Sequence, residues 1–149
     1  MREDEFPAFA AQSREGYARD LAENGGLAWE AAREKAEQDF ARFLGEGVRS
    51  PGQLLLVVEE DGERRGVVWF AEQEQLGRRA AFLYDIQIDE PFRGRGLGRQ
   101  AMEAFEAEVG SRGLEWIHLN VMGGNEVARR LYRSMGYGES FVAMAKRLA

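Results

Sequence analysis

The segment 82–99 constrains the fold most, because it joins a strand pattern, a glycine-rich loop and a helix pattern without interruption. Its first part is apolar, aromatic and β-branched up to the turn residues Asp89-Glu90-Pro91, which is typical of a strand. After the glycines it continues as RQAMEAFEAEV, with apolar residues at helical spacing and neither glycine nor proline. A second strand pattern follows at 114–122. Two strands separated by one helix predict a parallel pair with a right-handed crossover.

The loop between this strand and this helix alternates glycine with larger residues. It reads Arg93, Gly94, Arg95, Gly96, Leu97, Gly98, Arg99. Glycine lets a backbone approach a ligand closely, and the first turn of a helix offers unpaired N–H groups at the positive end of its dipole. The loop therefore predicts a site for a phosphate or pyrophosphate, with the arginines as charged donors. A flexible, solvated connection is the alternative for a loop of this composition.

Two common nucleotide fingerprints are excluded at this loop. The dinucleotide pattern G-x-G-x-x-G fails because Arg99 stands where the third glycine is needed, and the chain has no Gly-Lys-Ser/Thr triplet for a P-loop.

The remaining segments predict a mixed α/β domain over residues 1–149. Helix patterns cover 6–23 and 28–44, and two β-rich runs at 53–60 and 65–73 flank Asp61-Gly62, a strong hairpin signal. With the strand at 80–88 they predict a sheet that is antiparallel early and parallel at the loop. A last helix begins after Asn125, its predicted N-cap, and a final β stretch is expected at 137–148.

Composition excludes several classes of function. The chain has no cysteine and one histidine, so thiolate and histidine-rich metal sites are excluded. A net charge of −6 argues against general nucleic-acid binding. No apolar run approaches membrane-spanning length and no signal-peptide pattern begins the chain, which favours a cytoplasmic protein without a membrane partner.

A second motif lies in the predicted last helix and supports a ligand-binding role for the loop. Asn125, Ala128, Leu131, Tyr132, Gly136 and Tyr137 match the pattern N-x-x-A-x-x-L-Y-x-x-x-G-Y/F at every fixed position. Together with Arg93-x-x-Gly96-x-Gly98, this resembles the GNAT superfamily of CoA-dependent N-acyltransferases, and more narrowly a bacterial subgroup with Tyr-Asp-Ile before the loop and no well-defined acceptor. The resemblance implies a mostly antiparallel mixed sheet with a parallel pair splayed at the cofactor site, about four helices, and acetyl-CoA as co-substrate without a metal.

The resemblance also implies roles for particular residues. The loop 93–99 would hold the CoA diphosphate, and backbone N–H groups of Ile86, Gln87 and Ile88 would meet the pantetheine arm and the thioester. Asn125, Ala128 and Tyr132 are spaced three and four apart and so share one helical face along the cofactor. Tyr132 would be the general acid. A tyrosine with a pKa of about 10 stays protonated at neutral pH and can donate to a departing thiolate.

The general base is less clear from the sequence. Many family members have a glutamate where this chain has Gln87, which cannot take a proton. Asp85 shares the strand face of Gln87 and is the best nearby carboxylate. A purely structural role for Asp85 remains open, as do His118 or a chain of waters as the base.

These patterns predict an N-acetyltransferase that moves an acetyl group to a primary amine of a small molecule or a protein. The alternative is a non-catalytic acyl-CoA-binding or regulatory domain, which the glutamine at 87 keeps open. Family members usually begin with a strand before the first helix, and this chain has no room for one. The exposed hairpin edge leaves a homodimer, or a shortened chain, as explanations.

Overall fold

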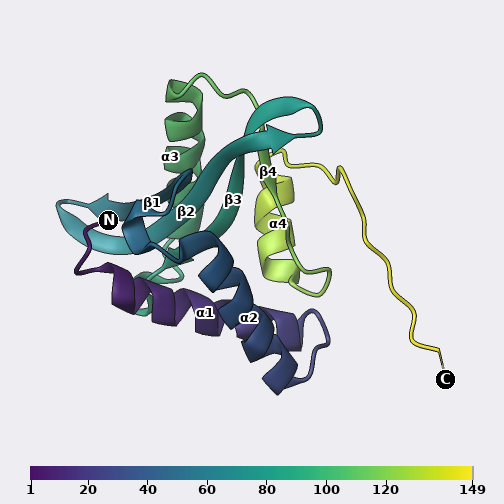
Figure 1. The fold of residues 1–149 in the computed structure, drawn as a ribbon. Coiled ribbons are helices and arrows are strands. Elements are labelled where there is room, and N and C mark those ends of the chain that lie inside the picture. Colours follow the sequence, from purple (N-terminus) through teal and green to yellow (C-terminus); the bar gives the residue numbers. More distant parts are fainter. Residues whose placement is uncertain (149) are drawn as a thin grey trace.

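The computed structural model describes residues 1–148 and places four α-helices around one four-stranded mixed sheet (Figure 1). The strands are β1 (Gln53–Glu60), β2 (Glu63–Gln75), β3 (Arg78–Ile88) and β4 (Ile117–Leu119). The helices are α1 (Phe6–Glu23), α2 (Trp29–Leu44), α3 (Leu97–Ser111) and α4 (Glu126–Ser134). The sheet order is β1-β2-β3-β4; the first three strands are antiparallel, and β3 and β4 run parallel. This confirms the predicted fold class.

Alternating side chains of β2 build a core on each face of the sheet. Val67 and Trp69 pack with Phe9 of α1 and Phe40 of α2, while Phe70 points to the opposite face and packs against α3. The two helices predicted at the start of the chain therefore cover one face, and the helix after the Gly-Arg loop covers the other.

The tight turns follow local chemistry. Asp61 and Gly62 both have positive φ, 53° and 77°, as a two-residue hairpin turn requires. Leu76 and Gly77 turn the chain from β2 into β3 in the same way, with φ of 51° and 75°. The second turn lies between the strands predicted at 65–73 and 80–88, and both strands extend further toward it than the sequence pattern indicated.

Two expectations about the C-terminal part are wrong: one predicted strand is shorter than expected, and the other is not a strand. The strand predicted at 114–122 is ordered as a strand only over Ile117–Leu119, because its pairing with β3 stops there. The β stretch predicted at 137–148 is not a strand, since no neighbouring strand lies beside it to form a ladder. Residues 140–148 of this segment are called the tail below. Figure 1 shows the tail running away from the body of the molecule.

Within residues 1–148, none of the helices combines the length and the apolar character needed to span a bilayer.

Candidate active site

An extra residue in β3 marks the place where the sheet opens. Trp69 pairs with Asp85 and its neighbour Phe70 pairs with Leu83, so Tyr84 has no partner on β2. This is a β-bulge, in which two residues of one strand oppose one residue of the other. The sequence carries no direct sign of it; only the family resemblance indicated an irregularity here.

The bulge changes which side chains face which side of the sheet. Before it, Leu83 points to the α3 face; after it, Ile86 points there again. Tyr84 and Asp85 both turn toward the α1 and α2 side, where Tyr84 stacks on Trp69 at 4.7 Å between ring centroids. Strict alternation would have aimed Asp85 at the apolar core against α3.

The same part of β3 has no strand partner on its β4 side. β3 and β4 pair from Ala81 with Ile117 to Leu83 with Leu119 and no further. Beyond that point the backbone groups of β3 that face β4 have no strand partner, including those among Ile86, Gln87 and Ile88. The parallel pair is therefore splayed where the sequence predicted contacts with an extended ligand.

The Gly-Arg loop begins α3 in the predicted way. Gly94 and Gly96 have φ of 77° and 76°, which favours glycine, and a Cβ at either position would meet no atom within 4 Å. Gly96 is the N-cap of α3, and the first turn has neither a capping side chain nor an acidic residue. Its first N–H groups are therefore available to an anion.

The other loop residues differ in what they offer. Leu97 is buried, so it can present only its backbone. Arg93 Nε donates to Ile88 O at 2.9 Å, and Arg99 donates to Ser134 of α4. Arg95 is exposed. The guanidiniums of Arg93 and Arg99 thus brace the loop against β3 and α4 as well as adding positive charge.

The carboxyl group of Asp85 accepts hydrogen bonds from side chains of α1 and β3. Ser13 Oγ and Gln87 Nε2 both donate to Asp85 Oδ2, the latter at 2.7 Å, which confirms that Asp85 and Gln87 share a strand face. Asp85 Oδ1 has no side-chain partner among the described residues. Burial raises the pKa of Asp85 to about 6, although the hydrogen bonds from Ser13 and Gln87 lower it. The residue as a whole is partly exposed and lines the cleft, while its carboxyl group is buried.

Sequence reasoning missed Ser13 as a partner of Asp85. The available signal was a lone hydroxyl on the apolar face of the first helix, where Ser13 is buried beside Phe9 and Ala10.

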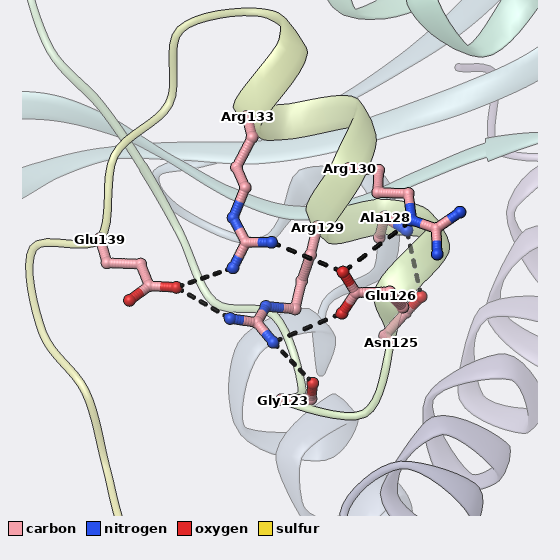
Figure 2. Close-up of polar contacts among 8 residues, drawn as sticks. All are labelled: Gly123, Asn125, Glu126, Ala128, Arg129, Arg130, Arg133 and Glu139. Carbon is pink, nitrogen blue, oxygen red and sulfur yellow. Dashed lines mark hydrogen bonds and ion pairs between the residues drawn. The ribbon is translucent and has the colours of Figure 1, made fainter.

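Tyr132 reaches the same region from α4. The helix starts at the predicted cap, where Asn125 Oδ1 accepts from Ala128 N at 3.2 Å (Figure 2). Burial raises the pKa of Tyr132, and the carboxylates of Asp85 and Asp20 raise it further. The phenol is therefore protonated across the neutral range.

One open cleft of about 2010 Å³ brings half of the predicted site residues together. Those on its lining are Asp85, Ile86, Gln87, Arg93, Asn125, Ala128 and Tyr132. Ile88 and residues 94–99 lie beside the cleft rather than on its lining. His118, the alternative base, also lines it, and its buried Nε2 has no hydrogen-bond partner among residues 1–148.

Aromatic and charged side chains of α1 and α2 border the other end of the cleft. Tyr17 OH donates to Asp39 Oδ2 at 3.1 Å, and Lys35 Nζ lies 2.9 Å from the same oxygen. Burial, and then the bond to Asp39, raises the pKa of Tyr17 to about 12. In the part of the chain that the structure describes, His, Asp and Glu side chains form no group of three suited to a metal ion.

Comparisons with known proteins agree with this geometry. Residues 14–137 match the acetyltransferase (GNAT) family. YdgE of Bacillus subtilis (strain 168), named an uncharacterized N-acetyltransferase, is 32% identical over 149 residues, 99% of this chain and 95% of that protein. The crystal structure of YycN from Bacillus subtilis has a TM-score of 0.91 at 29% identity, covering 100% of this chain and 96% of that chain.

A more distant likeness extends to a solved complex. The crystal structure of a predicted acetyltransferase with acetyl-CoA from Clostridium acetobutylicum has a TM-score of 0.64 at 13% identity over 97% of this chain and 92% of that chain, which shows the fold alone. The family match spans most of this chain, and YdgE resembles nearly all of it. The chain therefore belongs to the acetyltransferase (GNAT) family and is an acyltransferase.

Proposed function

We propose that this protein transfers the acetyl group of acetyl-CoA to a primary amine in the cleft between β3 and β4. The observation that carries the proposal is the bulge at Tyr84 together with the end of β3–β4 pairing at Leu83 and Leu119. These two features expose unpaired backbone beside Asp85 and leave room for an extended ligand that points toward Tyr132.

Several features of the chain fit acetyl-CoA. The uncapped start of α3, the left-handed Gly94 and Gly96 and the nearby arginines suit a diphosphate. The backbone groups at Ile86 and Gln87 that face β4 and have no strand partner suit the amides of a pantetheine arm. Ala128 leaves space on the face of α4 that it shares with Tyr132. When bound, acetyl-CoA supplies the acetyl group as an activated thioester.

The two titratable groups divide the proton transfers between them. Asp85 is ionised above pH about 6, and Oδ1 is free of side-chain donors, so it can accept a proton from the ammonium form of the acceptor. Tyr132 stays protonated and can donate to the sulfur as the C–S bond breaks and the C–N bond forms. Ser13 and Gln87 hold the carboxyl group in place through its other oxygen.

The test is thiol release from acetyl-CoA in the presence of a panel of amines. The chain has no cysteine, so every thiol detected comes from CoA. Tyr132→Phe should lower kcat by roughly 10²- to 10⁴-fold, the usual contribution of a positioned acid. Acetyl-CoA at about 100 times its Kd should still stabilise the variant by about 2.7 kcal/mol, because binding does not need the proton.

Tyr84→Phe is the matched control. Tyr84 also borders the cleft, but its hydroxyl donates to Gln73 at 3.3 Å. This variant should retain turnover. Equal losses in the two variants, or unchanged turnover in Tyr132→Phe, would remove Tyr132 from the role of acid.

A further inference from the structure

The part of the cleft that α1 and α2 border carries three cationic side chains, and they differ in whether a carboxylate neutralises them. Arg19 Nη2 lies 2.6 Å from Glu15 Oε1, and Lys35 Nζ lies 2.9 Å from Asp39 Oδ2. Arg42, in the last turn of α2, forms no ion pair with any side chain of residues 1–148. Its charge is therefore available to an anion that enters the cleft.

Aromatic stacking holds the guanidinium of Arg42 at the cleft wall. Its Cζ lies 4.3 Å from the centroid of the Phe43 ring, and Phe43 packs against Tyr84 at 5.0 Å between centroids. Burial raises the pKa of Tyr84 and the charge of Arg42 opposes that shift, so the guanidinium acts on the residue next to Asp85. A guanidinium that stacks through its face keeps the N–H groups at its edge free, and their fork matches a carboxylate.

The carboxylates that lack a cation act at the other end of the cleft, toward α4. Asp85 accepts from neutral side chains, and Asp20 accepts from Asn24 Nδ2 at 2.6 Å. Within residues 1–148, neither carboxylate pairs with a cation. Burial raises the pKa of Tyr132, and both carboxylates add to that shift, so both act near its phenol. The cleft is therefore negative near Tyr132 and positive at Arg42.

We propose that the acceptor is an amino acid in the broad sense, a molecule whose amine lies at Asp85 and whose carboxylate binds Arg42. This assignment rests on the acetyl transfer proposed above, because it gives that cleft a class of substrate. Such a zwitterion matches the unpaired carboxylate and the unpaired guanidinium with one molecule. A diamine would bring a second cation against Arg42, and an alkylamine would gain nothing from it.

The other charges of α1 and α2 do not offer an equivalent site. Tyr17 OH donates to Asp39 Oδ2 at 3.1 Å, and Lys35 pairs with the same oxygen, so Asp39 is already satisfied by a hydroxyl and a cation. An anion that approached Lys35 would have to compete with Asp39, and an anion at Arg19 would have to compete with Glu15. Arg42 is therefore the residue of this lining that we assign to the carboxylate.

Thiol release from acetyl-CoA with two matched sets of acceptors tests the assignment. One set contains the common α-amino acids together with ω-amino acids of two to six carbons. The other set contains the same amines without the carboxylate. For one or more pairs, the wild type should have a kcat/KM for the amino acid that is roughly 10- to 100-fold higher, as a charge-assisted hydrogen bond provides. The difference should lie mainly in KM, because the carboxylate is not a reacting group.

Variants of two arginines on the same lining show whether the preference comes from Arg42. Arg42→Gln should bring the ratio close to one by raising KM for the amino acid. Arg42→Lys keeps the charge without the fork and should give an intermediate ratio. Arg42→Glu should favour diamines over amino acids. Arg19→Gln is the matched control: it removes a cation that Glu15 already neutralises, so the preference should stay. Far-ultraviolet circular dichroism checks that each variant is folded.

The result that overturns this assignment differs from the result that overturns the proposed function. If amines are acetylated equally well with and without the carboxylate, or if the preference persists in Arg42→Gln, the zwitterionic acceptor is wrong and acetyl transfer stands. If no amine of either set releases thiol from acetyl-CoA, the proposed function fails and the assignment fails with it.

Discussion

The two sides of the molecule differ in how complete they are. On the N-terminal side, α1, α2, β1, β2 and α3 enclose cores that contain fully buried Phe9, Phe70 and Met102. On the C-terminal side, α4 contains no buried residue, β4 is three residues long and the tail is exposed. The first side supplies its own stability. The second side borders an open cleft and carries exposed apolar side chains, so its order should depend on what it binds.

The largest effect is expected in the enclosed half. Phe70 is 0% exposed and its ring meets Phe105 edge-on at 5.1 Å between centroids. Phe70→Ala should lower the free energy of unfolding by about 3–5 kcal/mol, through lost burial and the cavity left behind. Urea denaturation measures this. Val127→Ala in α4, at a position 84% exposed, should change it by less than about 0.5 kcal/mol. Similar losses in both variants would break the comparison.

The second-largest effect is expected at Asp85, which lies between the two sides. The pKa of Asp85 is raised from 3.8 to about 6 in the folded protein, so the folded state holds the proton more tightly than the unfolded chain does. The stabilisation that this group contributes to the folded state is fully present below pH about 4. It is lost as the pH rises to about 6, which lowers the free energy of unfolding by about 3 kcal/mol for a shift of about two pKa units. Asp85→Asn should lack this decline, while the carbonyl oxygen of the introduced amide still accepts from Ser13 and Gln87.

Chemical denaturation at pH 4.5 and pH 7.5 gives the measurement. The difference in unfolding free energy between the two pH values should be smaller in Asp85→Asn than in the wild type. Equal differences in both proteins would mean that the carboxyl group titrates normally. If Asp85 is the base, the same variant should lose acetyl transfer even though it is more stable at pH 7.5.

A smaller and local effect is expected in α4. Asn125→Ala removes the side-chain cap on Ala128 N, which is worth about 1 kcal/mol. Because α4 has no buried residue, the loss should appear as faster hydrogen exchange of α4 amides while exchange in α3 stays unchanged. Asn125→Asp keeps a capping oxygen and should exchange like the wild type. Faster exchange in both helices would show that α4 unfolds together with the rest.

The smallest effect on stability is expected at Glu139. Arg129 and Arg133 lower the pKa of this exposed carboxyl group through their hydrogen bonds. Exposed pairs are weak in water, so Glu139→Gln should leave the urea midpoint unchanged. Limited proteolysis should nevertheless cut the tail faster once its anchor to α4 is lost, and Glu126→Gln on the same arginines serves as the comparison. An unchanged rate of cutting would mean that the anchor does not position the tail.

The success of prediction from the sequence differs between the same two sides of the molecule. α1, α2, the hairpin and α3 are specified by periodicity and turn residues within each segment, and all four are confirmed. The cap at Asn125 is equally local and is also confirmed. The end of β4 and the absence of a strand in the tail depend on whether a neighbouring strand lies alongside, which no local pattern records.

The sequence predicts the residues of a candidate site more fully than it predicts their geometry. The Gly-Arg loop and the residues of α4 follow from spacing, and Asp85 follows from strand alternation with Gln87. The bond between Ser13 and Asp85 joins residues 72 positions apart, and the bulge at Tyr84 depends on register with β2. Both are consequences of tertiary packing, so they became visible only in the folded chain.

Tyr84 also determines which kinds of genetic change β3 can tolerate. A substitution there alters one ring, whereas an in-frame deletion of the codon would remove the extra residue itself. Leu83 and Asp85 would then be adjacent in a regular ladder opposite Phe70 and Trp69, and every later residue of the strand would keep its face. In a library of single-codon deletions, this position should therefore be among the more tolerant of β3, even though Tyr84 is partly buried.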